Sequence, residues 1–289
     1  MSVEEIEEMI NKYSPKTTPW EIKEEEFPVK GEFRDKVEFL LLYAILAPSS
    51  HNSQPWNFSI QDNKISIFKD KSRWLKVADA DQRELYISVG CALESLIIAA
   101  EHFGYSHQEE YFPKGEDDLV VFVELAEQGD IKKPRNPSLF NQIPRRHTNH
   151  NLYRTQKIPE AEMARLHACI YEEGFWMFST NEGPYVTYNE AELRQRVDEL
   201  ITRADAIQLT DQAYKNELAY WIGQGAFGTP WLMAKIGQLA VTYLNISGGQ
   251  TKKDSEMLLS APALVALASS ANDLKSQVMT GQIFDRIAL

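Results

Sequence analysis

The sequence has 289 residues, a formal net charge of −12, and 43% hydrophobic, 11% aromatic and 25% charged residues. These proportions are typical of one or two globular domains, and they exclude a chain that is disordered, collagen-like or coiled-coil throughout. The negative charge argues against general nucleic-acid binding, which depends on a basic surface that neutralises phosphates. Two cysteines, Cys91 and Cys169, are too few for a disulfide framework. No signal peptide is visible, and the longest apolar run, residues 39–47, is shorter than the ~20 residues of a membrane span. We therefore expect a reducing, cytoplasmic location without membrane contact.

The first part of the chain predicts three helices, a hairpin and a strand. Residues 2–5 form a capping box, which predicts a short N-terminal helix. Apolar residues at helical spacing predict a helix over 35–47 that Pro48 ends. Alternating strands at 56–60 and 65–68, with a turn at 61–64, predict a hairpin. A long helix should begin at Asp79 or Asp81 and end near Phe103, before Gly104, and a β-branched strand should cover 119–125.

The second part begins with a proline-rich segment, residues 131–159, which we interpret as the seam between two halves, 1–130 and 131–289. Beyond it the pattern predicts helices near 160–173, 190–209 and 231–245, and a last helix from about residue 272. Strands are predicted at 175–179 and 263–269, with a Gly/Pro break at 223–230 and a loop hinge at 247–250. Because strands do not alternate with helices, the expected class is α+β, with helices packed on a modest central sheet.

The segment Ala47–Trp56 concentrates polar side chains between two prolines. Proline fixes its own φ and favours extended geometry before it, so the loop should be stiff. The amides of Asn52 and Gln54 offer donors and acceptors that suit a flat heterocycle such as the pyrimidine edge of a flavin. A simpler interpretation is a capped turn, because Ser, Asn and Pro are common turn formers.

The seam reverses the sign of the chain's charge. Residues 131–159 contain seven Lys and Arg residues and no Asp or Glu, centred on Arg145-Arg146-His147-Thr148-Asn149-His150. An Arg fork matches phosphate oxygens and Thr adds a hydroxyl donor, so an anionic phosphate ligand is one interpretation. A solvated basic linker, or pairing with the protein's own acids, is the other. The spacing of His147 and His150 lacks the i, i+4 pairing of zinc-binding helices, so no metal is expected.

Together the two segments resemble the nitroreductase family, and in particular its Acg-like, FMN-binding branch. Residues 48–56, Pro-Ser-Ser-His-Asn-Ser-Gln-Pro-Trp, resemble the family's P-S-S-x-N-x-Q-P-W stretch, and 145–150 resemble its R-R-x-S/T-x-R/K phosphate motif. The resemblance implies a nitroreductase-like fold in which two halves form a fused pseudo-dimer around one FMN. It assigns Arg145, Arg146, Thr148 and His150 to the FMN phosphate, and Ser49, Ser50, Asn52 and Gln54 to the isoalloxazine or ribityl.

Two departures from the family pattern are visible. His150 stands where the family has Arg or Lys, which would make phosphate binding depend on pH. Family members also continue with a loop and strand that help to complete the pocket, whereas the sequence stops at Leu289 within a predicted helix. Either the sequence is truncated or the pocket is completed differently.

The function that the resemblance implies is an FMN-dependent NAD(P)H oxidoreductase, with hydride passing through FMN to a flat, electron-poor nitroaromatic or quinone-like acceptor. No catalytic side chain is assigned. The alternatives are an FMN-sequestering protein with little turnover, and a protein without flavin that uses the basic seam for docking. We expect a small-molecule substrate, no nucleic-acid partner, and a monomeric pseudo-dimer or a homodimer.

Overall fold

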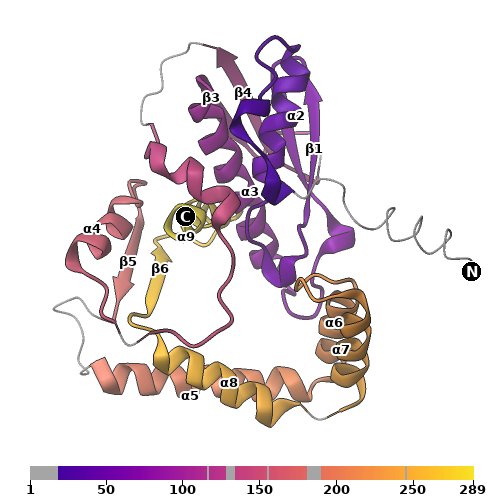
Figure 1. Ribbon diagram of the computed structural model, residues 1–289, viewed down its shortest axis with the longest axis vertical. Helices are drawn as coiled ribbons and strands as arrows, with labels where there is room; N and C mark the ends of the chain where they lie inside the picture. The colour runs from indigo at the N-terminus through magenta and orange to yellow at the C-terminus, as the bar shows by residue number, and fades with distance from the viewer. Residues whose placement is uncertain (1–18, 116, 128–133, 155, 181–189, 245) are drawn as a thin grey trace, which may run out of the picture.

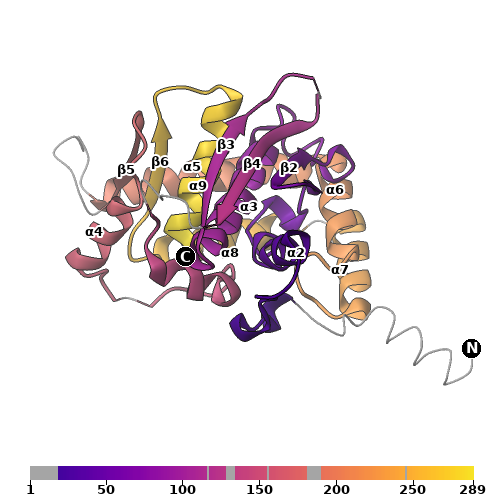
Figure 2. The same cartoon turned by 90° about the horizontal axis from the view of Figure 1, so that it is seen from above.

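The computed structural model describes residues 19–115, 117–127, 134–154, 156–180, 190–244 and 246–289. The helix predicted from residues 2–5 lies outside them. Figure 1 and Figure 2 show a body built around helix α3, from which two pairs of helices, α5 with α8 and α6 with α7, extend. The α+β class is confirmed, but the described strands form two separate antiparallel sheets rather than one central sheet.

The larger sheet has four antiparallel strands in the order β1-β2-β4-β3. The predicted hairpin is confirmed as β1 (Trp56–Gln61) and β2 (Lys64–Lys69), and the predicted third strand as β4 (Leu119–Glu127). Alternate β4 residues, Val121, Val123 and Leu125, are buried on the face that meets the core. The edge strand β3 (Tyr105–Tyr111) was not predicted, because its Ser-His-Gln-Glu-Glu centre has no apolar alternation.

Helix α3 (Arg83–His102) forms the centre of the core, packed against α2 (Phe33–Ala44) and the sheet. The carboxylate of Asp79 accepts backbone N–H bonds from Glu84 and Leu85, both at 2.9 Å, which satisfies free donors at the helix start. Gly104, at φ +84°, follows its end. Among the described helices α3 alone has the length and hydropathy of a membrane span, but 83% of that window is buried within the protein, as in a globular core.

Helix α9 (Leu274–Ala288) runs against α3 at backbone contact distance. A Cβ atom added to Gly281 would lie 2.8 Å from the carbonyl carbon of Ile87 and 2.9 Å from the Cα of Gly90. Only glycines at both positions permit this approach. The predicted halves, 1–130 and 131–289, therefore share one core along this contact, and the division at residue 130 stays a prediction.

The remaining elements form a second sheet and the two helix pairs. Helix α4 (Glu160–Ala168) leads to β5 (Phe175–Ser179), which pairs antiparallel with β6 (Val265–Ser269). Helices α5 (Glu190–Thr210) and α8 (Ser247–Ser260) pack together, as do α6 (Gln212–Gly223) and α7 (Trp231–Tyr243).

The structure corrects several predicted boundaries. Residues 247–250 are the first turn of α8 and not a hinge, and both α6 and α8 were missed. Helix α2 ends at Ala44, three residues before the predicted end, and α4 ends at Ala168 rather than near residue 173. Helix α8 was missed because its glycines and polar residues leave no helical spacing of apolar side chains in the sequence. Packing against α5 stabilises the helix in spite of this weak helix propensity.

Candidate functional site

The loop between α2 and β1 adopts a strained backbone. His51, Asn52 and Gln54 have φ values of +50°, +49° and +51°, in a region that favours glycine. Two bonds hold this geometry: the Ser49 hydroxyl oxygen accepts from the Gln54 backbone N–H at 2.9 Å, and Gln54 Nε2 donates to the Ile45 carbonyl at 3.2 Å. Strained non-glycine residues that the surroundings hold in place cluster at functional sites, so the loop is a candidate by its backbone alone.

Hydrogen bonds join helix α6 and the turn that follows it to the strained loop and to residues 77–78. Asn52 Nδ2 donates to the carbonyl oxygen of Ala226 at 2.8 Å. The Glu217 carboxylate on α6 accepts from the backbone N–H of Val77 at 3.1 Å and of Ala78 at 2.9 Å. The helix pair α6–α7 is therefore held beside the loop at two points, one of them through a predicted site residue.

A cavity of about 410 Å³ lies where the loop, the helix pairs and the seam meet. This volume is within the range of ~300–1,000 Å³ that is typical of small-molecule sites. The lining residues are His51, His150, Asp205, Gln208, Leu209, Tyr214, Leu218, Ile222, Phe227, Thr229, Val241, Ile246, Gln250 and Asp254. His51 belongs to the first motif and His150 to the second, so the structure brings the two segments to one cavity.

The rings of three lining residues lie close together. The His51 ring centroid is 6.0 Å from that of Phe227 and 6.3 Å from that of Tyr214. Burial lowers the pKa of His51, against the opposing effect of Glu217 and Glu84, and its Nδ1 atom is buried without a partner among the described residues. A neutral imidazole with one free ring nitrogen can donate or accept a hydrogen bond, depending on its tautomer.

A second part of the lining, the acidic wall, carries two carboxylates. Asp205 on α5 and Asp254 on α8 both line the cavity, and none of the lining residues is Lys or Arg. Burial, followed by the charge of Asp254, raises the pKa of Asp205, whose Oδ2 atom has no partner in the described part of the chain. Burial likewise raises the pKa of Tyr214. Sequence reasoning missed this wall, because its residues lie on helices whose packing no local pattern reveals.

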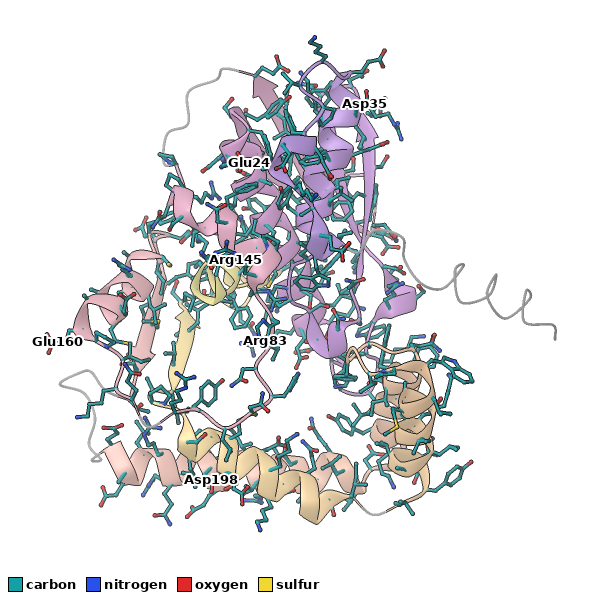
Figure 3. The ribbon with its side chains drawn as sticks, in the orientation of Figure 1. Glu24, Asp35, Arg83, Arg145, Glu160 and Asp198 are labelled. Atoms are coloured by element: carbon teal, nitrogen blue, oxygen red, sulfur yellow. The ribbon has the colours of Figure 1, made fainter. Side chains whose placement is uncertain are left out.

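The predicted phosphate segment follows the 3₁₀ helix η5 (Pro137–Arg145), as Figure 3 shows at the labelled Arg145. Arg146 Nη2 donates to the carbonyl oxygen of Leu46 at 3.2 Å, two residues before Pro48, so this arginine touches the base of the strained loop. Arg145, Thr148 and His150 are exposed, and no described carboxylate lies within ion-pair distance of Arg145. Donors for an anion are therefore present outside the acidic wall.

The eight predicted site residues thus fall into two groups by their contacts. Ser49 and Gln54 hold the loop, Asn52 holds the α6–α7 turn, and Arg146 contacts Leu46. Arg145, Thr148, His150 and the Ser50 hydroxyl make no side-chain hydrogen bond to a described residue. The roles of all eight toward a ligand stay predictions. No three His, Cys, Asp or Glu side chains of the described residues gather as metal ligands would.

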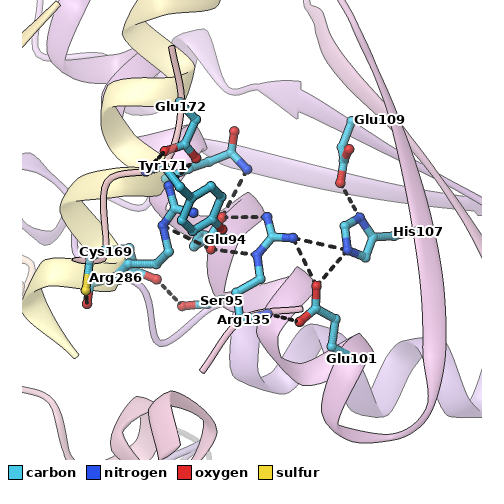
Figure 4. A network of polar contacts seen from close by, with 12 residues as sticks. Glu94, Ser95, Glu101, His107, Glu109, Arg135, Cys169, Tyr171, Glu172 and Arg286 are labelled. Carbon is cyan, nitrogen blue, oxygen red and sulfur yellow. Dashed lines mark hydrogen bonds and ion pairs between the residues drawn. The ribbon is translucent and has the colours of Figure 1, made fainter. Parts of the chain in front are cut away.

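One arginine of the basic seam is bound by the protein's own acids. Arg135 pairs with Glu94 at 2.9 Å and with Glu101 at 3.0 Å, and Figure 4 shows His107 in the same network. Glu94 is fully buried and also lies 3.4 Å from Arg286 on α9, whose guanidinium contacts Glu172 as well. For Arg135, internal pairing is therefore the correct interpretation of the seam's charge, while Lys132 and Lys133 lie outside the described residues.

The residues present fit a flavin mononucleotide on three observations. The cavity has a suitable volume and aromatic walls, the Nδ1 atom of His51 has no partner among the described residues, and neither do the side chains of Arg145 and Thr148 at and after the end of η5. Because the cavity lining has no Lys or Arg, those side chains outside it would have to hold the phosphate. Cys91, buried on α3 with its Sγ 3.3 Å from the Gly281 carbonyl, is a core thiol whose pKa burial raises.

Comparison with known proteins gives distant relatives. "Putative NAD(P)H nitroreductase Rv3131" of Mycobacterium tuberculosis is 26% identical over 190 residues, 66% of this chain and 52% of that protein. "Putative NAD(P)H nitroreductase acg" of the same organism is 25% identical over 189 residues, 65% of this chain and 54% of that protein. "Probable NAD(P)H nitroreductase PigM" of Serratia sp. is 26% identical over 147 residues, 48% of this chain and 40% of that protein.

The chain spans about half the length of the curated relatives that it matches. No family model matches it. The relatives agree in their names, however, and they agree with the family that the two motifs at 48–56 and 145–150 indicate. The chain is therefore a distant relative of proteins named as NAD(P)H nitroreductases, acg among them, and its resemblance to the nitroreductase family is confirmed at low identity.

Proposed function

We propose that the chain binds FMN between the loop 48–56 and the segment 145–150 and acts as an NAD(P)H oxidoreductase of nitroreductase type. The acceptor would be a flat, electron-poor compound such as a nitroaromatic or a quinone. The observation that carries the proposal is a cavity that both His51 from one motif and His150 from the other border. The names of the distant relatives support the oxidoreductase class and the nicotinamide donor.

The basic segment would supply the phosphate contacts. Arg145 and Arg146 present planar forks that match phosphate oxygens, and Thr148 adds a hydroxyl donor. Arg146 already donates one N–H to the Leu46 carbonyl, which leaves its other N–H groups for an anion and fixes its position against the loop. His150, at the end of this segment, lines the cavity.

The loop and the aromatic walls would hold the ring system. Ser50 and the free carbonyl oxygen of the Asn52 amide are placed on the strained loop, whose geometry is fixed before a ligand arrives. His51, Tyr214 and Phe227 offer flat surfaces that exclude water from one side of a planar ligand. When bound, FMN supplies the chemistry of accepting a hydride and passing electrons on, while the protein supplies position and electrostatics.

The test is anaerobic reduction of the FMN-loaded protein. Excess NADPH or NADH should bleach the flavin absorbance near ~450 nm, a property of the cofactor, and a nitroaromatic or quinone should restore it with turnover. Asp62→Asn, in the exposed β1–β2 turn, should behave as the wild type. Bound flavin that stays coloured with both nicotinamides would contradict the reductase and support FMN sequestration.

A further inference from the structure

The acidic wall of the cavity has no role in holding a phosphate. Asp205 and Asp254 come from α5 and α8, which pack against each other, and the charge of Asp254 acts on Asp205. Both oxygens of Asp254 accept from Gln250 Nε2, at 2.9 and 3.0 Å. Asp205 Oδ2, by contrast, is buried without a partner among the described residues. A ligand that donates a hydrogen bond to this oxygen would therefore satisfy an acceptor that no described residue occupies.

The rest of the lining leaves these charges without compensation. The apolar wall is made by residues that include Leu209, Leu218, Ile222 and Val241, and the aromatic wall by Tyr214 and Phe227. Burial lowers the pKa of His51, which favours its neutral form, and His150 is the other lining residue that can carry positive charge. The cavity therefore combines a flat apolar space with an uncompensated negative edge.

We propose that this cavity selects its ligand by charge, taking flat aromatic molecules that carry an N–H donor or a cationic nitrogen and rejecting aromatic carboxylates. The donor group would lie against Asp205 and Asp254, and the ring against the apolar wall, which leaves Tyr214 and Phe227 to the flavin. A carboxylate of the same size would meet two like charges across a partly desolvated space, where charges interact more strongly than in water. This deepens the proposed function, because the acceptor would enter this cavity.

The discriminating experiment compares three probes of one shape: benzamidine, benzamide and benzoate. Their affinities for the purified protein are measured by ligand-observed NMR or calorimetry, without turnover. The cationic probe should bind at least about tenfold more tightly than benzoate, and the neutral amide should lie between them; tenfold corresponds to ~1.4 kcal/mol. Asp205→Asn and Asp254→Asn should each shrink the ratio between benzamidine and benzoate, and the near-isosteric amides keep the cavity shape.

Asp62→Asn removes a similar charge in the exposed β1–β2 turn and should leave the ratio unchanged. The proposal is overturned if benzoate binds as tightly as benzamidine, if no probe binds, or if both cavity variants keep the wild-type ratio. With FMN-loaded protein, 4-nitrobenzylamine should also be reduced with a lower KM than 4-nitrobenzoate. A charge preference in binding without any flavin reduction would leave this inference standing and defeat the proposed function instead.

Discussion

Replacing Gly281 by alanine tests the backbone contact that joins the two predicted halves. The new Cβ would meet the Ile87 carbonyl carbon at 2.8 Å and its oxygen more closely still, whereas ordinary contacts begin at 3.4 Å. The carbon contact alone requires α3 and α9 to separate by the difference, at least about 0.6 Å. Both sides are helix backbone, so no side chain can rotate away. Overpacking of this kind costs ~1–3 kcal/mol, and we expect the upper end, reduced by up to ~1 kcal/mol of helix propensity.

The assay is urea unfolding of Gly281→Ala against the wild type, followed by circular dichroism. Gly248→Ala is the matched control, because an added Cβ at this α8 position meets nothing within 4 Å. That variant should be neutral or stabilised by up to ~1 kcal/mol. If Gly281→Ala unfolds at the same urea concentration as the wild type, the close approach of α3 and α9 is wrong.

Three further outcomes are expected. Arg146→Ala should weaken FMN binding by ~1.5–3 kcal/mol in a titration, which is the value of a lost charged hydrogen bond. Replacing the exposed Lys157 by alanine should leave the FMN affinity unchanged. If Arg146→Ala binds FMN as tightly as the wild type, Arg146 is not part of the site. Burial lowers the pKa of His107, but its two neighbouring glutamates outweigh this and raise it to about 9. The charged His107 should thus contribute up to ~3 kcal/mol to the free energy of unfolding below pH 6.5, and this contribution should disappear as the pH rises to about 9. The difference in unfolding free energy between wild type and His107→Gln, measured across this pH range, reports the contribution. A difference that does not change with pH would refute the raised pKa of His107. Asp79→Ala should cost ~1–2 kcal/mol in urea unfolding, because two N–H groups of α3 lose their acceptor, and an unchanged midpoint would contradict that role.

Elements with strong local signals were predictable from the sequence. The β1–β2 hairpin follows from strict alternation around a four-residue turn, and its register pairs Gln61 with Lys64. Helix α3 follows from its apolar pattern, with Asp79 before it and Gly104 after it. Strand β3 was missed because its polar centre has no apolar alternation, and helices α6 and α8 were missed because packing against α7 and α5, rather than a strong local pattern, stabilises them.

The site was predictable only as far as its motifs. That the loop 48–56 and the segment 145–150 approach each other follows from the family resemblance, and the Arg146–Leu46 bond agrees with it. The positive φ angles of His51 and Asn52 have no signal in residue type beyond the tolerance of Asn for that region. The pairing of Arg135 with buried Glu94 and the acidic wall of the cavity arise from tertiary contacts, which a count of charges along the chain does not reveal.

Titration of the purified protein with FMN tests the central claim most directly. The account predicts saturable binding, seen as quenching of flavin fluorescence and a visible absorbance band near ~450 nm, a property of the flavin. Binding should reach one FMN per chain, with the ligand at the cavity that both motifs border. A colourless protein that takes up no added FMN would contradict the account.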